Sequence, residues 1–252
     1  MCRLLGGLIN DYSHWPFQMK LPPLEINHRI GVDSFLISAE LTNKSKGLYN
    51  RNITFFGKTP TKNTIIASML QMADIKPYEV VYDPMCGVGS VPIEVGTNVD
   101  YLPNLAFGSD IFGPCLRSFE GNLETFRKFG RPNQRQLELS HVNMFQADAT
   151  NLPLRDSSID CIISDLPFGK RIGSKKSNRE IFLPFFNDLA RVTRPENGRA
   201  VVMTTDRQGV RQAIESKLNG KYWKFADFKC VNHGNIKVAI WLIKRSAKVF
   251  VR

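Results

Sequence analysis

The sequence predicts an α/β fold in which a doubly wound, mostly parallel sheet ends in an antiparallel hairpin. Two observations lead to this fold class. Between residues 61 and 218, short apolar stretches alternate with segments whose apolar residues recur at helical spacing. After residue 222 the alternation stops, and two β-rich runs are joined across Asn232-His233-Gly234-Asn235, a composition typical of a hairpin. Five β/α units and one hairpin make a sheet of seven strands.

Residues 1–34 are expected to form an irregular segment, because they show no clear period and contain Pro16, Pro22 and Pro23. Residues 35–252 are expected to form one domain, which is long enough to bury its own core. The expected helices span residues 61–74, 90–95, 111–129, 178–192 and 207–218, and the expected strands span residues 33–41, 79–82, 106–110, 142–146, 159–164, 199–205, 222–231 and 237–244.

The chain has 252 residues, a net charge of +11 and a pI near 9.6. Such a charge favours an anionic partner, although a basic protein without such a partner is an alternative. No apolar run is long enough to span a bilayer, and the first residues do not resemble a signal peptide. The five cysteines and four histidines are scattered, which indicates neither a disulfide framework nor a zinc site. A reducing compartment inside the cell, cytoplasmic or nuclear, is therefore expected.

Four of the expected strands end in residues suited to a ligand, and ligands bind at the carboxyl ends of the strands in such sheets. The first strand runs into Asp83-Pro84-Met85-Cys86-Gly87-Val88-Gly89-Ser90. Gly87 and Gly89 allow a ligand to approach the backbone closely. A dinucleotide-binding loop would need a third glycine where Pro92 stands, and no P-loop lysine follows. Asp83 is therefore expected to accept from an ammonium group, and a plain strand-to-helix turn is the alternative.

The second and third strand ends add to this site. Asp110 can accept hydrogen bonds from both hydroxyls of a ribose, or it can cap the following helix. Asp148, in Gln146-Ala147-Asp148-Ala149, can read the edge of an adenine ring, or it is a turn residue. Together the three ends predict a site for S-adenosylmethionine, which is a nucleoside with an amino-acid tail and no phosphate. The expected cofactor-binding residues are Asp83, Met85, Gly87, Gly89, Asp110, Asp148 and Ala149, and no metal is expected.

The fourth strand end is Ser164-Asp165-Leu166-Pro167-Phe168-Gly169-Lys170-Arg171. Its Asp-Leu-Pro-Phe resembles the signature of class I S-adenosylmethionine-dependent methyltransferases that methylate amino groups. Together with Arg51-Asn52-Ile53-Thr54-Phe55-Phe56-Gly57, Asp83-Pro84-Met85-Cys86-Gly87 and Ile172-Gly173-Ser174-Lys175-Lys176, it makes the chain resemble the THUMP-domain guanine 2-amino RNA methyltransferases over residues 35–245.

This resemblance implies a Rossmann-like sheet and methyl transfer to the 2-amino group of a guanosine in tRNA or a related small RNA, such as a small nuclear RNA. It also implies a small zinc-binding activator subunit as a partner. The family carries a THUMP module that grips the RNA, and residues 1–34 are too few to form one. They are expected to be the remnant of a linker or of a missing RNA-binding region.

The Asp-Leu-Pro-Phe motif suits transfer to an exocyclic amine, whose lone pair is drawn into the ring. The Asp165 carboxylate and the Leu166 carbonyl can accept the two N–H bonds and leave the lone pair directed at the methyl group. Pro167 fixes its own φ and restricts Leu166 to an extended conformation. Phe168 can stack on the target base, which is worth about 1–3 kcal/mol. A strand end capped by an ordinary turn is the alternative.

A basic run around this motif is expected to contact RNA phosphates. Its members are Lys170, Arg171, Lys175, Lys176 and Arg179, and Arg51 is expected to join them; a solvated loop is the alternative. Two other functions stay open. One is methyl transfer to an adenine 6-amino group or a glutamine amide, and the other is a non-catalytic RNA-binding scaffold that keeps the fold.

Overall fold

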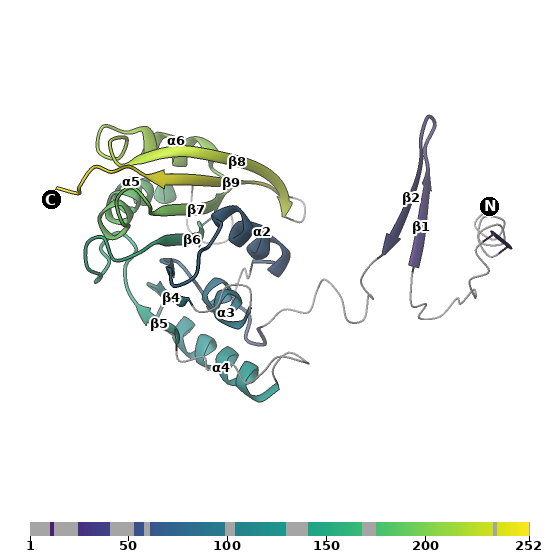
Figure 1. Ribbon diagram of the computed structural model, residues 1–252, viewed down its shortest axis with the longest axis horizontal. Coiled ribbons are helices and arrows are strands. Elements are labelled where there is room, and N and C mark those ends of the chain that lie inside the picture. The colour runs from purple at the N-terminus through teal and green to yellow at the C-terminus, as the bar shows by residue number, and fades with distance from the viewer. Residues whose placement is uncertain are drawn as a thin grey trace. The chain divides into compact units, whose positions relative to one another are not determined.

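A computed structural model describes residues 11–12, 25–40, 53–57, 61–98, 104–129, 141–167, 175–233 and 236–251. The chain divides into two compact units, Met1–Asn50 and Arg51–Arg252 (Figure 1). The second unit thus starts at Arg51, and not at residue 35 as expected. The reason is that β2 (Phe35–Glu40) pairs with β1 (Glu25–Ile30), a strand that lies within the segment expected to be irregular.

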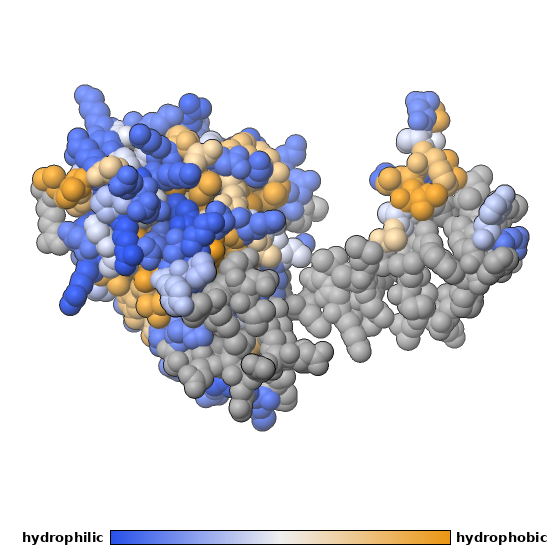
Figure 2. All heavy atoms as spheres, in the orientation of Figure 1, coloured by the Kyte–Doolittle hydropathy of each residue, from blue (hydrophilic) through white to orange (hydrophobic). Residues whose placement is uncertain are grey.

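The first unit contains an antiparallel hairpin with one apolar face. Ile30 pairs with Phe35, and the Gly31 amide donates to the Ser34 carbonyl at 2.7 Å to close the turn. Because side chains alternate along a strand, Ile30, Phe35 and Ile37 share one face. All three side chains are exposed (Figure 2).

The second unit is built on a seven-stranded sheet, as the sequence predicted. The strand order is β5-β4-β3-β6-β7-β9-β8, and every neighbouring pair is parallel except the two antiparallel pairs that β9 forms with β7 and β8. The strands are β3 (Val80–Asp83), β4 (Leu105–Asp110), β5 (Val142–Gln146), β6 (Cys161–Asp165), β7 (Arg199–Thr204), β8 (Trp223–His233) and β9 (Ile236–Arg245).

Helices cover both faces of this sheet (Figure 1). Apolar residues of α5 and α6 pack on one face, and apolar residues of α2 and α3 pack on the other. The sequence predicted five β/α units, but the connection from β5 to β6, residues 147–160, contains turns and no helix. The helices are α2 (Asn63–Ala73), α3 (Ser90–Thr97), α4 (Pro114–Phe129), α5 (Lys175–Val192) and α6 (Arg207–Glu215).

The terminal hairpin enters the sheet with its second strand innermost. β9 pairs with β7, so β8 lies at the edge. β9 reads IKVAIWLIKR and β8 reads WKFADFKCVNH, so the more continuously apolar strand takes the position that is buried on both faces. The Trp241 ring of β9 packs between the β8 rings of Phe225 and Phe228, with ring centroids 4.8 and 4.3 Å away.

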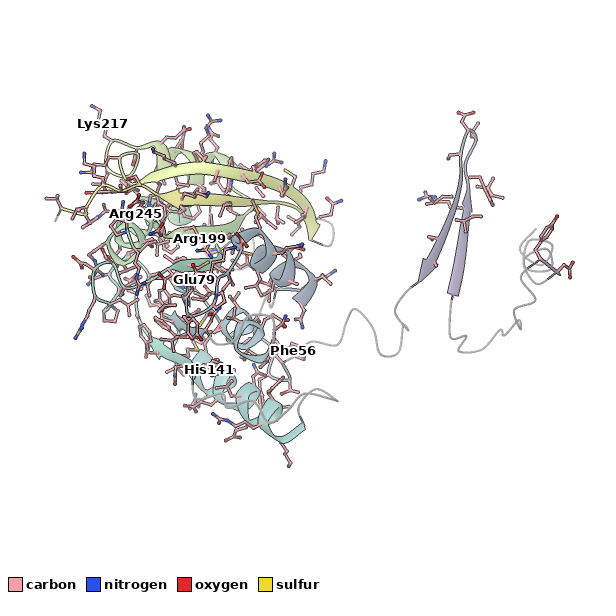
Figure 3. The ribbon with its side chains drawn as sticks, viewed as in Figure 1. Phe56, Glu79, His141, Arg199, Lys217 and Arg245 are labelled. Carbon is pink, nitrogen blue, oxygen red and sulfur yellow. The ribbon has the colours of Figure 1, made fainter. Side chains whose placement is uncertain are left out.

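A buried ion pair ties α2 to the amino edge of the sheet. The Arg199 guanidinium donates to both carboxylate oxygens of Glu79, at 2.8 and 2.6 Å, and to the Asp74 carbonyl at 2.9 Å (Figure 3). This network lies at the start of β7, so the carboxyl edge of the sheet is left for other chemistry.

Candidate active site

Three aspartates meet at the carboxyl edge of the sheet, where the strand order reverses between β3 and β6. Asp83 ends β3, Asp110 ends β4 and Asp165 ends β6. Burial raises the pKa of Asp83 to about 8, and the negative charges of Asp165 and Asp110 act in the same direction. The three carboxylates are therefore close enough to interact, in the crevice where such sheets bind ligands.

The loop after β3 has the backbone that its glycines suggested. Gly87 and Gly89 have φ values of 54° and 84°, in the left-handed region that side chains disfavour. A Cβ on Gly89 would lie 2.2 Å from Phe119 Cδ2, whereas a Cβ on Gly87 would meet nothing within 4 Å. Gly89 is thus needed for packing, and Gly87 keeps an open approach to the backbone. Pro92 lies in the first turn of α3, where proline is tolerated.

Asp83 and Asp110 are both held by the backbone of their own loops. Asp83 Oδ1 accepts from the Met85 amide at 3.1 Å. Asp110 Oδ1 accepts from the Phe112 amide and Oδ2 from the Gly87 amide, each at 2.9 Å. Helix α4 begins only at Pro114, so Asp110 does not cap it, contrary to the alternative interpretation. Asp110 instead fixes the glycine loop to the end of β4.

The third strand end lies next to this pair. Asp148 is exposed, and its Oδ1 accepts from the amide and from the hydroxyl of Thr150, both at 2.8 Å. Asp148 therefore makes the turn that was its alternative interpretation, and its contact with adenine stays a prediction. Ala149 is buried against the core on the α5 face.

Asp165 is held differently. Its Oδ2 accepts from the hydroxyl of Thr61, just before α2, and its Oδ1 is buried without a hydrogen-bond partner among the described residues. Burial raises the pKa of Asp165 to about 7, and the Thr61 hydrogen bond opposes that rise. Leu166 is anchored, since its side chain is buried and its amide donates to the Met203 carbonyl at 2.9 Å. The site thus keeps one buried acceptor oxygen uncommitted.

Several predicted residues lie outside the described part of the chain. Phe168, Lys170, Arg171 and Arg51 belong to this group, as do the side chains of Lys175 and Lys176 at the start of α5. Arg179 is described, and its contact with RNA stays a prediction. Its guanidinium donates to both oxygens of Asp206, at 2.6 and 2.9 Å, so it joins α5 to the start of α6.

The motif around Thr54 is fixed by a residue that sequence reasoning missed. The buried Asn122 of α4 accepts from the Thr54 amide at 2.8 Å and from the Phe55 amide at 2.7 Å. Its amide group donates to the Phe55 carbonyl at 3.1 Å and to the Val88 carbonyl at 3.2 Å. Asn122 therefore docks residues 53–57 onto the glycine loop. The one sequence signal for Asn122 was that an asparagine stands within an amphipathic helix. No sequence signal pointed to Thr61.

The described residues contain neither a candidate metal site nor a candidate membrane-spanning helix. No group of three or more histidine, cysteine, aspartate and glutamate side chains is placed to hold a metal ion there. No helix among the same residues combines the length and apolar character needed to cross a membrane.

Comparison with known proteins identifies the family. Residues 51–236 match the RMKL-like methyltransferase domain. The chain is 33% identical over 250 residues to the tRNA (guanine(6)-N(2))-methyltransferase THUMP3 of Mus musculus, covering 99% of this chain and 48% of that protein. It is 26% identical over 205 residues to the U6 snRNA (guanine-N(2))-methyltransferase THUMPD2 of Mus musculus, covering 81% of this chain and 35% of that protein.

The chain thus spans about half the length, or less, of these curated relatives. Among solved structures, TrmN from Thermus thermophilus superposes with a TM-score of 0.70 at 18% identity, covering 96% of this chain and 66% of that one, which shows a shared fold. The sheet order, the glycine loop and the family match over residues 51–236 lead to one conclusion: the chain belongs to the RMKL-like methyltransferase domain family.

Proposed function

We propose that this domain transfers a methyl group from S-adenosylmethionine to the exocyclic 2-amino group of a guanosine in RNA, with tRNA or U6 small nuclear RNA as the substrate. The names of the relatives support this acceptor. The observation that carries the proposal is the Asp165 carboxylate, which is buried beside two further strand-end carboxylates and has one oxygen without a partner in the described residues.

The cofactor fits the β3–β4–β5 half of the edge. Asp83 would accept from the ammonium group of the amino-acid tail, and the open backbone at Gly87 would allow that tail to approach. Asp110 would bind the ribose, and Asp148 the adenine. When bound, the cofactor supplies a methyl group on a positively charged sulfur. A cation so close to Asp83, Asp110 and Asp165 would also relieve their mutual repulsion.

The acceptor amine fits the β6 end. Asp165 Oδ1 and the Leu166 carbonyl would accept its two N–H bonds, which leaves the nitrogen lone pair directed at the methyl group. The anchoring of Leu166 by Met203 keeps that carbonyl in a defined position. Orientation of this kind can supply a large part of the rate enhancement of a one-step transfer. After transfer, the extra proton would leave the nitrogen to Asp165 or to water, and Phe168 would stack on the base.

The charge distribution supports an RNA substrate. Residues 199–252 contain twelve lysines and arginines and three aspartates and glutamates, so they hold most of the net charge of +11. In Figure 2, hydrophilic side chains project from the surface over α6 and β8. Contacts from the exposed cations of this region and from the basic loop (Lys170, Arg171, Lys175 and Lys176, with Arg51) would favour phosphates without reading sequence. A small zinc-binding activator subunit completes the proposal as a further partner.

Mapping of the product tests this function. The full chain, with and without an activator subunit, would be incubated with labelled S-adenosylmethionine and unmodified transcripts of tRNA and U6 RNA. We expect label on the 2-amino group of one guanosine. Label on an adenine 6-amino group or on a glutamine amide would reassign the acceptor. If calorimetry detects no cofactor binding under either condition, the proposal fails and the result favours a non-catalytic RNA-binding scaffold.

A further inference from the structure

We infer that Thr61 is a positioning residue for the transfer: its hydroxyl holds one oxygen of the Asp165 carboxylate, so that the other oxygen is presented to the acceptor amine. The effect on methyl transfer rests on the proposed function, whereas the contact between Thr61 and Asp165 is present in the structure. Thr61 is buried, and it lies 104 positions before Asp165 in the chain.

Asp165 cannot be fixed by its own loop. Asp83, Asp110 and Asp148 each accept a hydrogen bond from the amide two residues later. The residue two positions after Asp165 is Pro167, which has no amide hydrogen. The turn that fixes the other three carboxylates is therefore chemically impossible here.

A carboxylate without such a donor would not present a defined oxygen. The terminal torsion of an aspartate side chain is broad and nearly two-fold. The Leu166 amide does not help, because it donates to the Met203 carbonyl. Among the described residues, the Thr61 hydroxyl is the donor that reaches the Asp165 carboxylate. It distinguishes two oxygens that would otherwise be equivalent.

Thr61 is itself well fixed. The Lys62 carbonyl accepts from the amides of Ile65 and Ile66, at 2.9 and 3.0 Å, which closes the first turn of α2 directly after Thr61. Ile66 and Met69 are buried in the same core cluster as Met203, the residue that pairs with Asp165 across the sheet. The packing of α2 on this face therefore places the hydroxyl.

The hydroxyl that donates to Asp165 is uncharged. The ionisable groups of neighbouring strands that act on this part of the edge are Asp83 on β3 and Asp110 on β4, and both are acidic. Thr61 donates a hydrogen bond without bringing a cation that would compete with the cofactor. The same bond opposes the rise in the pKa of Asp165 that burial causes.

The test compares Thr61→Val, which keeps the shape and removes the donor, with Thr61→Ser, which keeps the donor. The full chain would be assayed on the transcript that the wild type methylates. We expect Thr61→Val to lower kcat about 10- to 100-fold, the loss of one hydrogen bond to a charged group, and to leave cofactor Kd within about twofold. Its kcat should recover partly as pH rises, and Thr61→Ser should stay within a few-fold of the wild type.

A matched control separates this role from a loss of stability. Thr97 is also buried, and its hydroxyl donates to the Ile93 carbonyl at 2.6 Å within α3. Thr97→Val should lower the melting temperature without moving the pH dependence of kcat. Thr61→Ala serves as the second donor-free variant if Thr61→Val does not fold.

Two results would overturn the inference. If the donor-free variant keeps the kcat and pH profile of the wild type, Thr61 does not position Asp165, although the proposed function stands. If the wild type methylates no RNA, the proposed function fails, and carbon-13 NMR titration of Asp165 in the cofactor-free chain decides the inference alone. A higher pKa in the donor-free variant but not in Thr61→Ser supports it, and equal values in all three proteins overturn it.

Discussion

The two halves of the carboxyl edge hold their aspartates in different ways. In the β3–β4–β5 half, Asp83, Asp110 and Asp148 each bond to the amide two residues later, so each carboxylate is fixed by its own loop. In the β6 half, Asp165 is held by Thr61, a side chain that is distant in sequence. In the proposed function, the first half would bind the cofactor, and the second half would keep one carboxylate oxygen available for the acceptor amine.

The comparison shows how one edge can separate binding from reaction. Each of the first three carboxylates has a donor within its own turn, and Asp110 accepts in addition from the Gly87 amide of the glycine loop. Asp165 depends on the packing of α2, and therefore on the integrity of the whole unit. Each of the following variants should affect one half and spare the other.

The largest effect is expected from Asp165→Ala. Removing the acceptor oxygen should lower kcat about 10²- to 10⁴-fold, because the amine loses both its orientation and its nearest proton acceptor. Cofactor Kd, measured by calorimetry, should stay within about twofold. Asp227→Ala, which removes an exposed carboxylate of β8, is the control and should change neither quantity. A large loss of cofactor affinity in Asp165→Ala would place Asp165 in the cofactor half and erase the distinction.

The next effect is expected from Asp83→Asn, which should weaken cofactor binding about 10- to 100-fold and leave kcat at saturating cofactor little changed. The affinity for the cofactor should rise with pH. Burial raises the pKa of Asp83 to about 8, so at pH 7 the carboxyl must lose a proton before it can pair with an ammonium group. Affinity should therefore rise by up to about tenfold per pH unit below pH 8 and level off above it.

The same pKa has a consequence for stability. Because the folded state holds the proton on Asp83 more tightly than the unfolded chain does, this group stabilises the fold most at low pH, and its contribution is lost as pH rises through about 8. Asp83→Asn should remove this contribution, together with its part of the pH dependence of affinity.

A wild-type affinity that is independent of pH between 6 and 8 would contradict the assignment of Asp83.

The smallest effect is expected from Pro167→Ala. The substitution restores an amide two residues after Asp165 and so makes the local turn of the other half possible. We expect kcat to fall about 3- to 10-fold, because the new donor competes with Thr61 for the carboxylate. Pro92→Ala in α3 adds an amide that does not follow a strand-end aspartate and should leave kcat unchanged. Equal kcat values in Pro167→Ala and the wild type would mean that the missing amide is unimportant.

Much of the fold and half of the site could be predicted from the sequence, and the reason is locality. The spacing of apolar residues predicted the main helices and strands, because the alternation between buried and exposed positions can be read from residues that are adjacent in sequence. Gly87 and Gly89 indicated a turn with positive φ values, since few other residues adopt such values. The turn donors of Asp83, Asp110 and Asp148 also lie two residues away.

Other features depended on contacts between distant segments. The pairing of β2 with β1, the insertion of β9 ahead of β8, the ion pair of Arg179 with Asp206 and the clamp by Asn122 each join such segments.

The sequence by itself determined that an aspartate stands at the end of β6 and that Pro167 removes its local donor. Only the tertiary structure decided which side chain replaces that donor. The physical reason is that a hydroxyl becomes a specific partner only when packing brings it to a buried carboxylate. Thr61 resembles any other threonine until α2 lies against the sheet.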